Sequence, residues 1–278
     1  MNVVGASRER GVSRGRSFAP ASQRTFIGAS ALLFAASTML TIVGCRSMST
    51  MGEMPMPGGW TMSMAWMRMP GQTWLGVAAS FLGMWSMMMV AMMLPSLVPV
   101  LWYFRQVVAR LGKTQLGRLT ALVGAGYFFV WTVFGAAAFA LGAALAAIEM
   151  SLPAVARAVP IAVGVVILIA GVLQFTAWKA HHLACCRGPS ASGVPLPAHA
   201  AAAWRHGLRL GFHCSTCCAG LTSILLVVGI MDLRAMVVVT AAITAERLAP
   251  GGERAARVIG AVAVGAGLLL LARASGLA

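Results

Sequence analysis

The chain has 278 residues, of which 59% are hydrophobic and only 10% are charged. Soluble domains hold about a quarter charged residues, so this composition excludes a water-soluble globular fold and is too apolar for a disordered chain. A net charge of +15 would suggest nucleic acid in a soluble protein, but here the basic residues lie between apolar runs. We therefore expect an all-α, polytopic transmembrane helical bundle that contacts the lipid bilayer and binds no nucleic acid.

Seven apolar runs approach the ~20 helical residues that a bilayer core requires. We predict spans at residues 26–44, 74–98, 119–147, 158–178, 208–230, 234–249 and 258–272, the last two being the shortest. If the N-terminus is cytoplasmic, 16 Lys and Arg residues fall on the inner side and 5 on the outer side, as the positive-inside rule requires. The expected protein is a multi-pass protein of the bacterial inner (plasma) membrane with an external C-terminus.

The runs divide the chain into five parts. These are a basic cytoplasmic segment (1–25), the first span (26–44), a methionine-rich external loop (45–73), the main membrane domain (74–257), and the seventh span with the C-terminus (258–278). The first span has an alternative reading, because the arginines before it and the residues up to Cys45 resemble a lipoprotein signal with its cleavage box. Its apolar run is longer than the ~7 to 15 residues of a signal core, which favours a membrane anchor.

Methionine is concentrated in one region, with 14 of its 19 copies between Met48 and Met93. Thioether sulfur is a soft ligand that favours Cu(I), although Met and Trp in the external loop would also suit an interfacial anchor. In the second span Met84, Met88 and Met92 are spaced i, i+4 and i+8, so they share one helix face. This spacing suits a path for a soft ion, and it also suits packing between helices.

The strongest motif is His213-Cys214-Ser215-Thr216-Cys217-Cys218 in the fifth span. Helical spacing places Cys214, Cys217 and Cys218 on one face with His213 at its edge. Three thiols and an imidazole are suited to half of a soft-metal site, which other residues would complete. The alternative is a set of small thiols that allow close helix packing, favoured by the Gly-x-x-x-Gly motif just before it.

Further donor residues are expected on the same side of the membrane. His181, His182, Cys185 and Cys186 follow the fourth span in a polar stretch, where they would either join the first cluster or stay solvated. Glu246 ends the sixth span at a similar depth, as a metal ligand, a proton acceptor or an interfacial partner of nearby Arg247. Neither a phosphate-binding loop nor a Ser/His/Asp set is present, so we expect neither an ATP-driven pump nor an enzyme.

Several short motifs occur in a fixed order. They are Met84-Trp85-Ser86-Met87, Ala91 to Ser96, Tyr127-Phe128, Val130-Trp131-Thr132, Gln174-Phe175-Thr176 with Trp178-Lys179, Cys186-Arg187, Gly207 to Cys218, Gly229 to Leu233, and Glu246-Arg247 with Pro250. In this order they resemble the DUF2182 family, described as predicted metal-binding integral membrane proteins. The resemblance covers about residues 75–255. It implies membrane location and metal binding, and the family has no well-defined activity.

These features lead to three hypotheses of different classes. The first is a soft-metal-binding membrane protein, with Cu(I) favoured over Zn or Ni, that handles or transports the ion between the external Met-rich loop and the cytoplasmic Cys/His cluster. The second is an assembly or maturation subunit for a partner metalloenzyme or metallochaperone. The third is a membrane thiol redox protein, since Cys214-x-x-Cys217 has redox spacing, although no thioredoxin-like strand pattern surrounds it.

Overall fold

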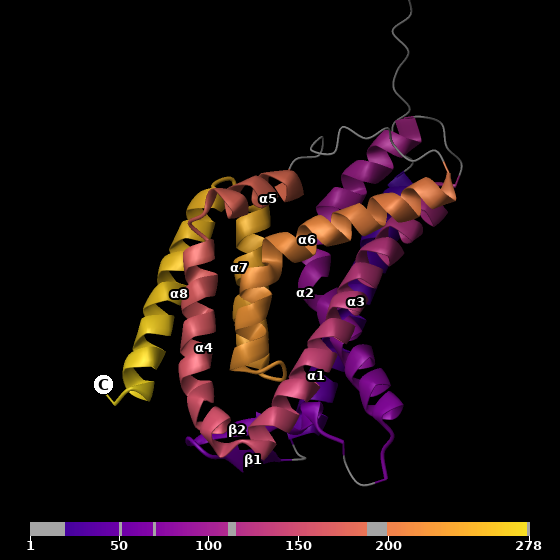
Figure 1. Cartoon of the computed structure of the whole chain (residues 1–278). Helices are drawn as coiled ribbons and strands as arrows, with labels where there is room; N and C mark the ends of the chain where they lie inside the picture. Colours follow the sequence, from indigo (N-terminus) through magenta and orange to yellow (C-terminus); the bar gives the residue numbers. More distant parts are fainter. Residues whose placement is uncertain (1–19, 50–51, 69–70, 111–114, 188–198, 277–278) are drawn as a thin grey trace, which may run out of the picture.

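The computed structural model describes residues 20–49, 52–68, 71–110, 115–187 and 199–276. These residues form a helical bundle with one small hairpin (Figure 1). The helices are α1 (Pro20–Ser49), α2 (Trp74–Arg110), α3 (Leu116–Ser151), α4 (Pro153–Leu173), α5 (Ala177–Arg187), α6 (Ala200–Val228), α7 (Leu233–Leu248) and α8 (Gly252–Ala274). The strands are β1 (Glu53–Met56) and β2 (Trp60–Ser63), followed by a short 3-10 helix, η1 (Met64–Trp66). The all-α polytopic bundle is confirmed.

Six helices in the described part of the chain are long and apolar enough to cross a membrane: α1, α2, α3, α4, α6 and α8. The sixth predicted run forms α7, which has 16 residues and reaches only about 24 Å at 1.5 Å per residue. That length falls short of a bilayer core of ~30 Å, so α7 is shorter than the six other helices formed by the predicted runs. Asp232 fixes the start of α7 by accepting hydrogen bonds from the amides of Arg234 and Ala235.

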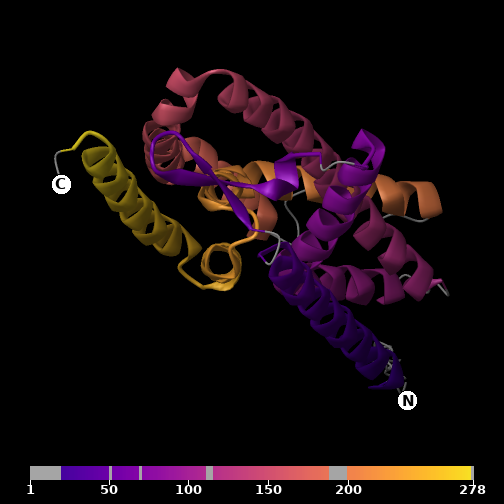
Figure 2. The same ribbon diagram turned by 90° about the horizontal axis from the view of Figure 1, so that it is seen from below.

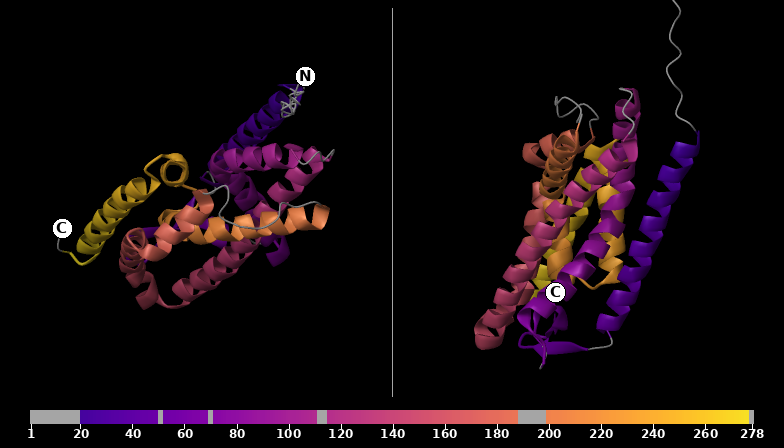
Figure 3. Two further views of the ribbon diagram at one scale, coloured as in Figure 1. Left: turned by 90° about the horizontal axis from the view of Figure 1, so that it is seen from above. Right: turned by 90° about the vertical axis from the view of Figure 1, so that its right-hand side faces the viewer.

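The bundle has two ends, which we name after the elements found there. The hairpin lies at one end, and α5 lies at the other (Figure 1). The helix α1 begins at the α5 end and descends to the hairpin, whereas α8 descends to the hairpin end and stops there (Figure 3). The beginning of α1 and the end of α8 therefore lie at opposite ends of the bundle, as the predicted topology requires.

The Met-rich segment folds into a hairpin instead of an open loop. Met54 pairs with Met62 and Met56 with Trp60, and the hairpin lies across the end of the bundle (Figure 2). The Trp60 indole donates a 2.8 Å hydrogen bond to the Ala156 carbonyl oxygen at the start of α4. The Met62 side chain is buried, so at least one methionine of this segment packs against the rest of the protein. Met51 and Met69 lie outside the described residues.

Close contact between α3 and α6 sets the position of the cysteine motif. A Cβ at Gly207 would lie 2.2 Å from the carbonyl oxygen of Val123, so only glycine allows this approach. Gly207 therefore allows the close packing of α3 and α6, as the glycine motif predicts, and this packing is compatible with a ligand role for the thiols. The same contact brings the cysteine face of α6 against Tyr127 of α3.

Candidate metal centre

Four cysteine side chains gather beneath α5, and we call them the thiol cluster: Cys186, Cys214, Cys217 and Cys218. The three from α6 share one face, as their spacing predicts, and the sulfurs of Cys214 and Cys218 lie 3.9 Å apart. Cys186 comes from α5, where its thiol donates to the His213 carbonyl oxygen at 3.4 Å and lies near Cys217. All four residues are at most 6% exposed.

The second donor group divides between two places. The sequence suggested a polar loop, but residues 177–187 form the helix α5, whose turns separate neighbouring side chains. Cys186 therefore points inward to the thiol cluster. Cys185 is half-buried and lies 3.8 Å from the His181 imidazole nitrogen Nε2, outside the cluster.

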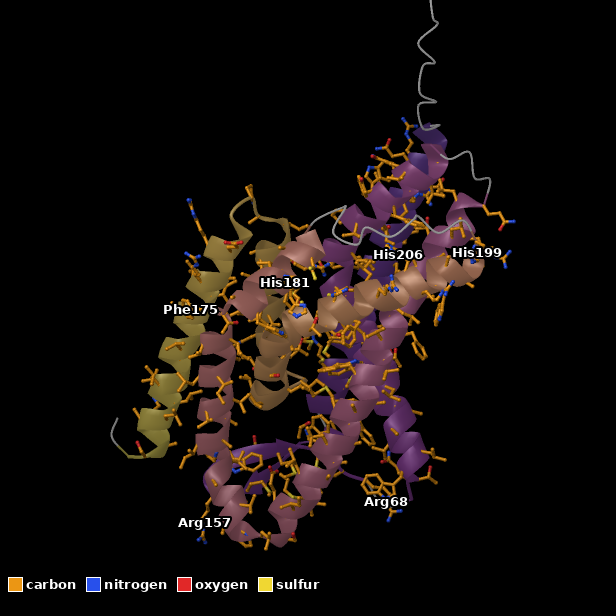
Figure 4. All side chains as sticks on the ribbon, turned by 45° about the horizontal axis from the view of Figure 1, so that its top comes forward. Arg68, Arg157, Phe175, His181, His199 and His206 are labelled. Atoms are coloured by element: carbon orange, nitrogen blue, oxygen red, sulfur yellow. The ribbon has the colours of Figure 1, made fainter. Side chains whose placement is uncertain are left out.

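Three histidines, His181, His182 and His213, lie near one another beside the cluster. His213 is exposed at the edge of the cysteine face, and the His182 ring centroid lies 6.4 Å from it. His181 projects from α5, whereas His199 and His206 lie near the beginning of α6 (Figure 4). No imidazole bond to a sulfur of the thiol cluster is found in the described structure, so the histidines form a separate outer group.

A buried arginine contacts the thiol cluster directly. The Arg247 nitrogen Nη1 donates to the Cys214 sulfur and to the Ser96 hydroxyl, both at 3.0 Å. The Tyr127 hydroxyl lies 2.9 Å from the same sulfur. A positive charge and hydrogen bonds at this distance stabilise a thiolate, which is the form of cysteine that binds metals.

A buried ion pair borders the other side of the cluster. Lys179 donates to the Glu246 carboxylate at 2.6 Å and to the Cys217 carbonyl oxygen at 2.8 Å. Burial disfavours the charged form of Lys179, but the neighbouring Cys217 and Glu246 outweigh it, so the pKa of Lys179 is raised. The hydrogen bond to Cys217, together with burial, raises the pKa of Cys186, which makes Cys186 a thiol that keeps its proton.

Glu246 is a structural ion-pair partner in this arrangement. Its carboxylate accepts from Lys179 and, at 3.0 Å, from the Gln174 amide, and the residue is 1% exposed. Its partners thus include Lys179 of α5 and Gln174. Glu246 and Arg247 are adjacent in sequence, but successive side chains on a helix diverge, so Glu246 meets α5 while Arg247 meets α6 and α2.

The methionines of α2 lead toward the thiol cluster. Met88 and Met92 are buried, and Met84 is half-buried, with its sulfur beside Gly44 of α1. Ser96 stands one helical turn beyond Met92 on the same face. Since Ser96 and Cys214 share the nitrogen of Arg247, their side-chain oxygen and sulfur lie at most 6.0 Å apart. The predicted methionine face thus ends at the cysteine motif.

The donor set is suited to a soft ion, but its present geometry is not that of a closed metal site. Within the described residues, no three or more His, Cys, Asp and Glu side chains are arranged to hold a metal ion. The thiols instead bond to one another, to Tyr127 and to Arg247. Thiolate and thioether sulfur select soft ions such as Cu(I), which would replace these hydrogen bonds on binding.

Five polar residues of the site were not recognised from the sequence as parts of it: Ser96, Tyr127, Gln174, Lys179 and Arg247. Each lies in a motif that carries the resemblance described above. Polar and ionisable groups inside apolar helices are costly, so their presence is itself a signal of function. The sequence shows these polar residues within apolar helices, but only the fold shows that they meet around four thiols.

Comparison with known proteins assigns the family. No curated protein and no solved structure matches the chain. The family model PpoB2, described as a copper chaperone, matches residues 82–270. That range contains the whole thiol cluster and overlaps the region that resembles DUF2182, and it supports the expected association with copper. The chain therefore belongs to the PpoB2 copper chaperone family.

Proposed function

We propose that this protein is a copper carrier of the bacterial inner membrane that moves Cu(I) between the hairpin end and the thiol cluster. The observation that carries the proposal is the junction at Arg247, where the methionine face of α2 meets Cys214. The family's copper association supports the identity of the cargo. The role is binding and transfer, without catalysis.

The order of the ligands favours transfer in one direction. The methionines of α2 offer neutral thioethers, whereas the thiol cluster offers thiolates beside two buried cations. Thiolates bind soft cations more strongly than neutral thioethers do, because their negative charge adds to the same soft donor character. A Cu(I) ion that enters among the methionines would therefore move toward the thiol cluster, which lies on the side that charge distribution makes cytoplasmic.

Delivery to a partner metalloprotein is the second candidate function. The word chaperone in the family description favours it, as does the outer group of His181, His182 and His213 above the cluster. A partner that docks at the α5 end would find imidazole ligands on the surface and thiols directly beneath. In this version the protein hands Cu(I) to a second protein at that end.

A methionine variant tests transfer. Replacing Met88 and Met92 together with Leu removes two sulfurs and should cost less than about 1.5 kcal/mol of stability, because Leu and Met have similar volumes. Met87→Leu is the matched control, since Met87 lies on the same helix but is 41% exposed on the outer face. Copper uptake into proteoliposomes and copper bound by purified protein are both measured.

The double variant should lose copper uptake while its thiol cluster still binds Cu(I), and Met87→Leu should behave as wild type. Wild-type uptake by the double variant would assign the methionines to packing, and delivery to a partner would then become the leading function. Absence of bound Cu(I) in the wild-type protein would refute both versions.

A further inference from the structure

Arg247 links the thiol cluster to α2 through hydrogen bonds to Cys214 and Ser96. It ends α7, it is 5% exposed, and its neighbour Glu246 is held by Lys179. One nitrogen, Nη1, makes both of its hydrogen bonds, to the Ser96 hydroxyl and to the Cys214 sulfur. This nitrogen therefore lies between the α2 residue that follows the methionine face and the Cys214 sulfur.

The guanidinium is incompletely bonded for a buried arginine. Its nitrogens Nε and Nη2 are shielded from solvent and have no hydrogen-bond partner among the described residues. Buried donors without partners carry a free-energy penalty, and most buried polar groups in proteins avoid it. Both hydrogen bonds of this side chain in the described structure thus come from a single nitrogen.

We propose that Arg247 is the resident cation of the thiol cluster and is displaced from Cys214 when Cu(I) binds. This inference rests on the proposed copper function. In the metal-free protein the guanidinium supplies the positive charge and the hydrogen bond that the Cys214 sulfur requires. Cu(I) on the same sulfur supplies the positive charge in its place, and the two cations repel each other at short distance in a buried site.

The consequence is that Arg247 competes with the cargo. A carrier must release its ion, and a competing cation at one ligand weakens the bound state and supplies a partner for the thiolate that is left behind. A simple anchor would bond through several of its five donors, as buried arginines do. Arg247 instead bonds at the ligand itself, which fits the role of a release-controlling residue.

The test compares Arg247→Gln with Arg105→Gln. Gln removes the charge in both cases, and Arg105 is a suitable control because it is also buried but bonds to Ser22 and Thr120, away from the thiols. The affinity for Cu(I) and its release rate are measured on full-length protein in detergent by competition with a chromogenic Cu(I) chelator. Wild type and both variants are measured at the same pH and ionic strength.

Arg247→Gln should bind Cu(I) at least ten-fold more tightly than wild type and release it more slowly, with Arg105→Gln unchanged. Equal or weaker binding by Arg247→Gln would overturn the inference, because Arg247 would then support the copper-bound state. If the Gln variant does not fold, Arg247→Met is measured in its place, because Met also removes the positive charge and should likewise bind Cu(I) more tightly than wild type. A wild-type protein without bound Cu(I) would refute the proposed function itself, which distinguishes the two failures.

Discussion

Lys179 and Glu246, 67 residues apart in sequence, form a buried ion pair of 2.6 Å beside the thiol cluster. Removing one partner of such a pair leaves an uncompensated charge and typically costs about 3 to 5 kcal/mol. Lys179→Met should therefore lower the thermal stability of the detergent-solubilised protein strongly. Adding Glu246→Gln should recover part of the loss, because the amide needs no counter-charge.

The control for this pair is Arg254→Met, which removes an exposed cation from the same end of the bundle. Surface substitutions usually change stability by less than about 0.5 kcal/mol. A Lys179→Met variant as stable as Arg254→Met would mean that the pair contributes nothing to the fold.

Cys217→Ser should lower the amount of Cu(I) bound by the purified protein while membrane insertion survives. Serine keeps the size of cysteine but loses the soft thiolate. Cys185→Ser is the matched control, because Cys185 directly precedes Cys186 on α5 yet lies beside His181 instead of in the cluster. Equal copper content in both variants would return the α6 thiols to a packing role.

The membrane helices were predictable because a bilayer demands long apolar runs, and all seven runs form helices. The hairpin was missed although Pro57-Gly58-Gly59 is a turn signal, and both glycines adopt positive φ angles there. The methionines on either side of this turn suit metal ligation as well as strand packing. Strand pairing of Met54 with Met62 depends on support from Trp60 and Trp66 against distant helices, which composition does not reveal.

The site was predictable only in part. Helical spacing placed Cys214, Cys217 and Cys218 on one face, since that relation is local. The contacts of Cys186 and Arg247 with them join residues about 30 positions apart and follow from how helices pack. Helical spacing cannot predict such contacts between different helices. The residues that make them nevertheless lie in the ordered motifs described above.

The orientation of the chain is open to a reporter test. A reporter fused after Arg257 should read cytoplasmic, and one fused at Ala278 should read external, because α8 is long and apolar enough to cross the membrane between them. Two cytoplasmic readings would show that α8 does not cross. Reversed readings would invert the bundle and place the thiol cluster outside.

Gly207 should be essential for the geometry of the site. A Cβ there would lie 2.2 Å from the carbonyl oxygen of Val123, a backbone atom that cannot move without shifting α3. Overpacking of this kind typically costs about 1 to 3 kcal/mol. Gly207→Ala should therefore push α6 away from α3 and separate Cys214 from Tyr127, whose hydroxyl is now 2.9 Å from the sulfur.

Gly220→Ala is the control on the same helix, since a Cβ at Gly220 meets its nearest neighbour at 3.5 Å, an ordinary contact distance. Thermal unfolding and Cu(I) binding are measured for both variants. The Gly207 variant should lose stability and copper affinity together, because one contact positions both the helix and the thiol. If it lost stability and kept wild-type affinity, the thiol cluster would assemble independently of the α3 and α6 contact, and Tyr127 would not be part of the site.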